Sequence, residues 1–145
     1  MNSFKTYTIP IEDKERVISI IRDELLKHEE IVFAYIYGSF VDPEMPFFRD
    51  IDIGIYVVKN TISAKQFMDY SINLSLELES ALKKYPVDVV ILNNASLNLA
   101  FKITQGKLLF IRNDDIWTDF VTKTCSLYHD HAITSRNILE EIITA

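Results

Sequence analysis

Two aspartates stand at a spacing that could place their carboxylates side by side. Asp50 and Asp52 are separated by one isoleucine, in a segment that alternates polar and apolar residues as far as Val58. Residues i and i+2 of a strand point to the same face, so both carboxylates would project together while Ile51 enters the core. Two such carboxylates repel unless they share a cation. The spacing favours a site for a hard divalent cation such as Mg²⁺, and a solvated acidic face is the alternative.

A third aspartate, Asp88, lies in the otherwise apolar segment 87–92. A carboxylate in such a strand is costly to desolvate unless it is paired, hydrogen-bonded or bound to a metal. If this strand neighbours the one that carries Asp50 and Asp52, all three carboxylates can converge on one site.

A glycine and a serine, Gly38 and Ser39, directly follow the β-branched and aromatic run Ile31–Tyr37. A glycine at a turn after a strand lets the backbone approach a ligand closely, and the following serine adds a hydroxyl. Exposed N–H groups at such a turn can bind an anion such as phosphate. Gly-Ser turns are common, so this pair indicates a phosphate site only together with the aspartates.

The spacing of apolar residues predicts the elements that position these side chains. Helices are expected at residues 11–30, 63–84 and 95–105, and one long helix or two at 115–143; strands are expected at 31–37, 50–58, 87–92 and 107–112. In the last helical region the expected packing residues are Trp117, Phe120, Leu127, Ile138 and Leu139. Asn94 is expected to cap the short helix, and Gly106 to end it in a left-handed conformation. This order predicts an α+β (α/β layered) domain with a mixed sheet of about four strands and helices packed on it.

Composition limits the classes of function. The chain has 145 residues, of which 48% are hydrophobic, and 15 Lys+Arg against 21 Asp+Glu give a net charge of −6. This length and composition predict one globular domain over residues 1–145. The acidic balance disfavours a nucleic-acid substrate, because binding to polymeric phosphate needs a basic surface, but it allows a single nucleotide. No apolar run suggests a signal peptide or membrane span, and the lone Cys125 suits a reducing compartment, so we expect a cytoplasmic location.

The pattern of Gly38-Ser39, ten further residues, Asp50-x-Asp52 and a later strand with Asp88 resembles the DNA polymerase β-like nucleotidyltransferase superfamily. Three segments are similar to minimal nucleotidyltransferase (MNT) domains: 87–93, which contains Asp88, then 97–110, and the closing stretch 127–142. The likeness is strongest to the MntA-type antitoxins that are encoded beside HEPN-domain toxins. It covers nearly the whole chain and implies a polymerase β-like fold.

The resemblance implies a Mg²⁺-dependent antitoxin enzyme that transfers AMP from ATP to a tyrosine of a partner HEPN ribonuclease toxin. The implied catalytic residues, which would also hold two Mg²⁺ ions, are Asp50, Asp52 and Asp88; the implied nucleotide-binding residues are Gly38, Ser39 and Arg49. On this interpretation Asp88 also helps to deprotonate the acceptor hydroxyl, and Gly54 leaves room for the nucleotide.

The segment between Ser39 and Asp50 departs from the pattern of many relatives, in which it is rich in arginine and glycine. Here Arg49 is its only base, so Lys65 and Lys102 are further candidates for a positive partner of the triphosphate.

Two other functions stay open. The chain could neutralise a toxin by covering it, without catalysis. It could instead be a nucleotidyltransferase for a small molecule, although the extra acceptor-binding domain expected of such an enzyme is missing from these 145 residues.

Overall fold

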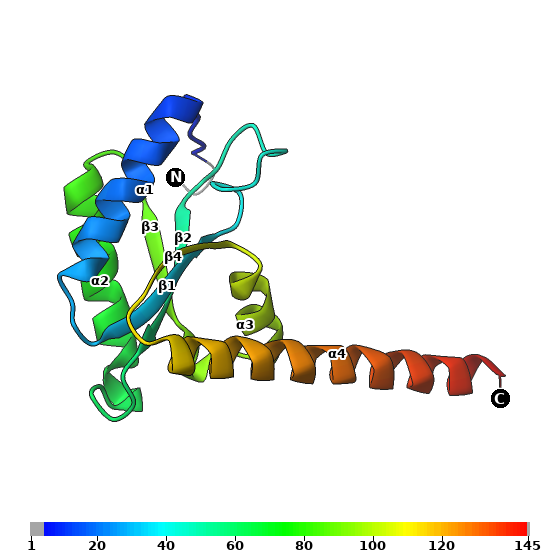
Figure 1. Cartoon of the computed structure of the whole chain (residues 1–145). Helices are drawn as coiled ribbons and strands as arrows, with labels where there is room; N and C mark the ends of the chain where they lie inside the picture. Colours follow the sequence, from blue (N-terminus) through cyan, green and yellow to red (C-terminus); the bar gives the residue numbers. More distant parts are fainter. Residues whose placement is uncertain (1–4, 145) are drawn as a thin grey trace.

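The computed structural model describes residues 5–144, in which helices and strands alternate along the chain (Figure 1). The four α-helices are α1 (Ile11–Leu26), α2 (Phe67–Leu82), α3 (Leu97–Thr104) and α4 (Asp114–Thr144). The four strands are β1 (Ile31–Tyr37), β2 (Ile51–Val57), β3 (Val87–Ile91) and β4 (Lys107–Ile111). Two short 3₁₀ helices, η1 (Ala64–Gln66) and η2 (Leu92–Asn94), follow β2 and β3. The predicted order of elements is confirmed.

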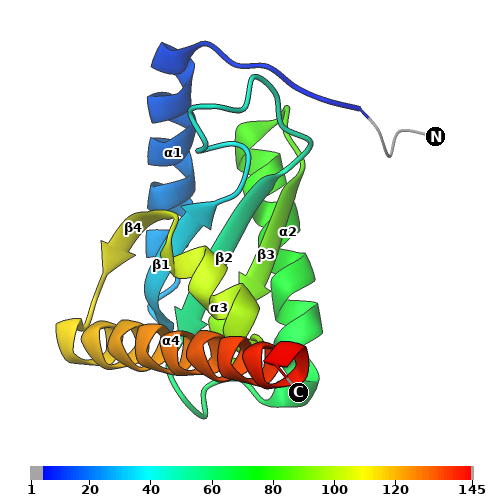
Figure 2. The same ribbon diagram turned by 90° about the vertical axis from the view of Figure 1, so that its right-hand side faces the viewer.

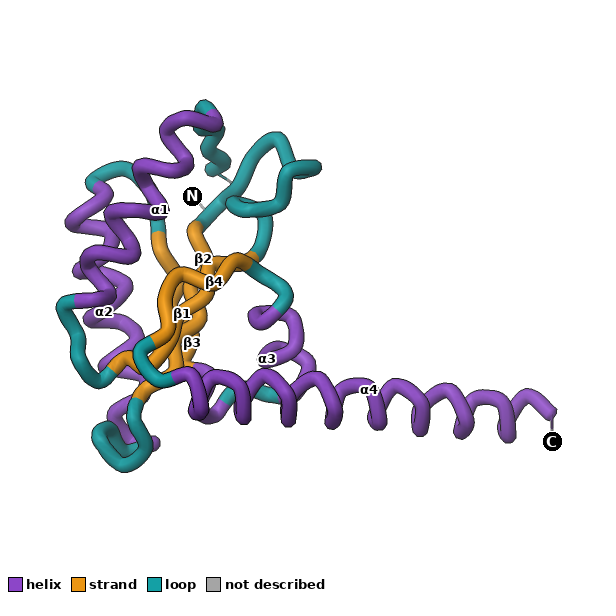
Figure 3. Tube along the Cα trace, in the orientation of Figure 1, coloured by secondary structure: helices purple, strands orange, loops and turns teal. Residues whose placement is uncertain are grey.

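The strands form one mixed sheet in the order β3-β2-β1-β4. β1 is antiparallel to both β2 and β4, whereas β2 and β3 are parallel. α1 and α2 lie on one face of the sheet, and α3 and the first half of α4 lie on the other (Figures 1 and 3). The prediction of an α+β layered fold with a four-stranded mixed sheet is therefore correct.

Alternate side chains of β2 enter two different hydrophobic cores, one on each face of the sheet. Ile51, Ile53, Ile55 and Val57 are buried in the core beneath α1 and α2. Tyr56, on the opposite face, is buried with the aromatic residues of β1 in the core beneath α3 and α4. The predicted alternation is thus confirmed, and it turns the side chain of Asp52 toward the α3 side of the sheet.

The ends of α3 differ from the prediction. Ser96, rather than Asn94, caps the helix, since its hydroxyl accepts a hydrogen bond from the Leu99 N–H at 3.3 Å. Gly106 does not have a positive φ, so its predicted left-handed conformation is wrong. A Cβ at Gly106 would lie 2.5 Å from the carbonyl oxygen of Ile36, so close packing against β1 explains this glycine.

Gly54 serves the packing of α3 on the sheet. A Cβ at this position would lie 2.5 Å from Cγ2 of Ile103, a fully buried residue of α3. The expectation that Gly54 leaves room for a nucleotide is therefore wrong. Its missing side chain lets α3 approach β2 closely, which is what brings α3 near the carboxylates.

Helix α4 is only half packed. Trp117 lies against the second core, and its indole N–H donates a hydrogen bond to the Tyr35 hydroxyl at 2.8 Å. The helix runs past α3 (Figure 2), where Tyr128 stacks on Phe101 with ring centroids 3.8 Å apart. Its C-terminal half then projects away from the other elements (Figure 1). Leu127, Ile138 and Leu139 are 51%, 52% and 58% exposed, so the prediction that they pack in the core is wrong. Within residues 5–144, α4 included, no helix combines the length and apolar content needed to cross a membrane.

Candidate active site

Three polar side chains form a row across neighbouring strands. Tyr37 of β1 pairs with Asp52 of β2 in the antiparallel register, and Asp52 pairs with Asp88 of β3 in the parallel register. Paired residues of neighbouring strands project to the same face, so these three side chains lie side by side. Along this row the exposure increases from the buried Tyr37 to the exposed Asp88. Asp50 directly precedes β2 and shares a side-chain hydrogen bond with Asp52. The sheet thus brings all three predicted aspartates together.

The row concentrates negative charge in a partly buried place. Burial, together with the charges of Asp50 and Asp88, raises the pKa of Asp52 from 3.8 to about 7. Burial and the charge of Asp50 also raise the pKa of Asp88. The pKa of the Tyr37 hydroxyl rises because of burial and the three nearby aspartates. The site therefore carries unbalanced negative charge, as expected of a site that binds cations.

The turn after β1 lies directly against this row. Gly38 has a φ of +83°, a conformation that L side chains rarely adopt. A Cβ at this position would lie 2.6 Å from Oδ2 of Asp52. The glycine is thus needed both for the turn and for the close approach of the backbone to the carboxylate. Ser39 follows it, partly exposed.

Replacing Gly38 with alanine is expected to destabilise the protein by about 1–3 kcal/mol, because strained backbone and a displaced Asp52 side chain would both result. A reaction carried out by this row should slow about a hundredfold, since the carboxylate would leave its place. Thermal unfolding and an activity assay check both effects. Unchanged activity in a folded Gly38→Ala variant would contradict this role.

A cavity of about 540 Å³ opens beside the turn. One wall is polar and consists of Tyr37, Gly38, Ser39, Lys102, Gln105 and Gly106. The other wall belongs to the long loop between β1 and β2 and consists of Val41, Asp42, Pro43 and Met45 (Figure 3). The size is ordinary for a small-molecule site. The contrast between the walls suits a ligand with an anionic end and a less polar body.

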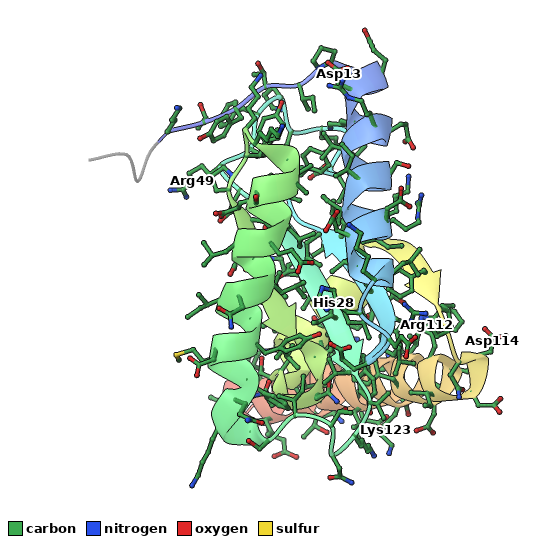
Figure 4. The ribbon with its side chains drawn as sticks, turned by 90° about the vertical axis from the view of Figure 1, so that its left-hand side faces the viewer. Asp13, His28, Arg49, Arg112, Asp114 and Lys123 are labelled. Atoms are coloured by element: carbon green, nitrogen blue, oxygen red, sulfur yellow. The ribbon has the colours of Figure 1, made fainter. Side chains whose placement is uncertain are left out.

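The three basic candidates lie in different places. Arg49 is exposed, points away from the body of the protein (Figure 4), and is not among the residues that line the cavity. Lys65 lies in η1, beyond the far end of β2 from Asp52. Lys102 of α3 does line the cavity.

The three aspartates supply only carboxylate oxygens as possible metal ligands. Among residues 5–144, no three His, Cys, Asp or Glu side chains have the arrangement of a complete metal site. The chemistry of the row nevertheless fits Mg²⁺, which prefers carboxylate oxygens and keeps open positions for water and phosphate. Asp50 lies close enough to Asp52 to interact with it directly, so the two carboxylates could share a cation.

A mixed sheet with an Asp-x-Asp strand beside a Gly-Ser turn defines a nucleotidyltransferase domain. The family model described as "Polymerase beta, Nucleotidyltransferase" matches residues 20–115, which include the turn and all three aspartates. The chain belongs to this family. No curated protein sequence matches the chain.

Several solved structures are similar over nearly the whole chain. One, described as the tri-AMPylated Shewanella oneidensis HEPN toxin in complex with MNT antitoxin, is 26% identical with a TM-score of 0.57, covering 91% of this chain and 97% of the solved chain. A second, described as a toxin-antitoxin with AMP-PNP, is 26% identical with a TM-score of 0.60 over 90% and 98%. A third, described as the toxin-antitoxin MntA-HepT, is 24% identical with a TM-score of 0.59 over 92% and 99%, and shows the same fold.

Proposed function

We propose that this nucleotidyltransferase is an antitoxin that transfers AMP from ATP to a tyrosine of a HEPN-domain toxin. The observation that carries the proposal is the placement of Asp52 beside Asp88, with the Gly38 turn packed against Asp52. The family supplies the class of reaction. The similarity to structures described as an AMPylated HEPN toxin with its antitoxin, and as a toxin-antitoxin with AMP-PNP, supports the acceptor and the nucleotide.

In the proposed reaction the acceptor oxygen forms a bond with the α-phosphorus of ATP, and the bond from that phosphorus to the bridging oxygen breaks, so pyrophosphate leaves. Asp50, Asp52 and Asp88 would hold Mg²⁺, which when bound neutralises charge on the attacking and leaving oxygens. Asp88 is exposed and would also accept the proton of the acceptor hydroxyl. The Gly38 N–H and the Ser39 hydroxyl would donate hydrogen bonds to a β- or γ-phosphate oxygen.

The acceptor would reach the carboxylates from solvent. The cavity opens to solvent beside the carboxylates, and the loop from Val41 to Met45 forms its outer wall. The projecting half of α4 exposes Ile138, Leu139 and Ile142, which is unusual for a monomer and suits a protein partner. These exposed apolar residues of α4 support a macromolecular acceptor.

The test is an assay with ATP labelled at the α-phosphate, Mg²⁺ and a purified HEPN-domain ribonuclease as the acceptor. We expect label on a tyrosine of that protein and loss of its ribonuclease activity, with both effects abolished by Asp52→Asn. A ribonuclease that stays unlabelled yet is inhibited equally well by Asp52→Asn would overturn the proposal in favour of a binding antitoxin. Label on a small-molecule acceptor alone would favour the other class of nucleotidyltransferase.

A further inference from the structure

The cavity beside the carboxylates lacks a cation on its loop side. The loop residues in its wall are Val41, Asp42, Pro43 and Met45, none of which is basic. Asp42 is acidic, and its Oδ1 accepts a hydrogen bond from the Glu44 N–H at 2.9 Å. A triphosphate in this cavity would therefore meet no positive side chain from the loop, although phosphates are usually bound by lysine or arginine as well as by backbone N–H groups.

Helix α3 supplies a cation to the same cavity from the opposite side. Among the described residues of the cavity wall, Lys102 is the one with a positive charge, and it lines the cavity together with Gly38 and Ser39. The side chain is exposed, so its ammonium group can move toward a ligand without loss of core packing.

The position of Lys102 is determined by its neighbours in α3. Ile103, the next residue, is fully buried and packs over Gly54. Gly106, just beyond the helix, lies against the backbone of Ile36. These two contacts hold the last turn of α3 against β1 and β2, so the Cα of Lys102 stays near the Gly38 turn while its side chain remains free.

Two other lysines are close but engaged elsewhere. Lys14 and Lys107 line a separate cavity of about 310 Å³, which adjoins the first through Val41 and Gly106. The Lys107 ammonium lies 3.5 Å from the carboxylate of Glu15, and the Lys14 ammonium lies 5.5 Å from the centre of the Phe40 ring.

We propose that Lys102 binds the β- or γ-phosphate of the nucleotide and so replaces the basic loop residues that this chain lacks. The inference rests on the proposed function, because it assumes that a nucleoside triphosphate occupies the cavity. On this proposal the positive charge that binds the triphosphate comes from α3 rather than from the β1–β2 loop, and Arg49 is not required at the site.

The test compares nucleotide affinities of Lys102→Met with those of the wild-type chain in the presence of Mg²⁺. AMP-PNP, ADP and AMP are the probes, and calorimetric titration is the measurement. We expect AMP-PNP affinity to fall about tenfold to a hundredfold, because a charge-assisted bond to phosphate is lost, and AMP affinity to stay within about twofold. ADP affinity should fall with AMP-PNP if the β-phosphate is bound and stay unchanged if only the γ-phosphate is.

Two further variants serve as controls. Lys65→Met removes a lysine of the same kind at the other end of β2 and should bind all three nucleotides like the wild type. Lys102→Arg should retain most of the AMP-PNP affinity. Equal weakening of AMP and AMP-PNP by Lys102→Met, or no weakening of either, would overturn the role of Lys102 while the proposed function stands. A wild-type chain that binds no AMP-PNP would instead overturn the proposed function, and this role with it.

Discussion

Asp52→Asn is expected to lower nucleotidyl transfer about a thousandfold or more and, at the same time, to make the metal-free protein more stable at pH 8. The loss of activity follows because Asp52 is the central carboxylate of the row, next to both Asp50 and Asp88. The gain in stability follows because the same carboxylate is ionised among other negative charges when no cation is present.

The size of the stabilisation follows from the pKa of Asp52. Burial and two neighbouring aspartates raise this pKa from 3.8 to about 7. The full shift corresponds to about 4 kcal/mol, but Asp52 is partly exposed to screening solvent, so we expect about 1–2 kcal/mol. For a chain of this length that is a rise in Tm of about 3–6 °C.

The direction of the Asp52 pKa shift determines how the stability of the protein depends on pH. Because the folded pKa of Asp52 is higher than the unfolded value of 3.8, the folded state binds more protons between those two pKa values. The wild-type protein therefore loses stability as the pH rises from about 4 to about 7, and the loss is complete above that range. The advantage of Asp52→Asn should be near zero at pH 4 and full at pH 8.

Thermal unfolding in EDTA across this pH range is the measurement. Asp130→Asn is the matched control, because Asp130 is an exposed aspartate in the projecting half of α4 and its substitution should leave Tm unchanged. An Asp52→Asn protein that is less stable than the wild type at pH 8 would show that the ionised carboxylate is held by favourable contacts, contrary to the unbalanced negative charge described above.

Much of the fold follows from local patterns in the sequence. The alternation from Asp50 to Val58 predicts both the strand and the face on which Asp52 lies, because a side-chain period of two leaves no other choice. The sequence predicts that Asp88 converges with Asp52 only if their two strands are neighbours. Their parallel pairing meets that condition, and it is a property of the whole sheet rather than of either segment.

The features that sequence reasoning missed, and the choice of Lys102 among the three basic candidates, all depend on contacts between distant elements. Tyr37 reads as one more apolar strand residue, and only the β1–β2 register reveals it beside Asp52. Lys102 reaches the cavity because Ile103 packs on Gly54, about fifty residues earlier in the chain. The exposed apolar residues of α4 looked like core residues because helical spacing records amphipathicity, not what the apolar face contacts.

The affinity of the site for divalent metal is expected to fall steeply below pH 7. Asp52, whose pKa is raised to about 7, must lose its proton before both of its oxygens can bind a cation. Metal binding and proton binding therefore compete at this carboxylate. The apparent affinity for Mn²⁺, used as a probe for Mg²⁺, should drop about tenfold between pH 8 and pH 6.

The competition also predicts how many protons leave when metal binds. About nine-tenths of Asp52 is protonated at pH 6 and about one-tenth at pH 8. Metal binding should therefore release about one proton per metal at pH 6 and almost none at pH 8. Calorimetric titration of Mn²⁺ in buffers of different ionisation enthalpy measures this release. Metal alone is used because a nucleotide would add protons of its own. In Asp52→Asn the proton release at pH 6 should disappear, leaving only a small contribution from Asp88, whose pKa is also raised by burial and by Asp50. An Mn²⁺ affinity that stays constant from pH 6 to pH 8 would place the metal away from Asp52 and would require a different ligand set.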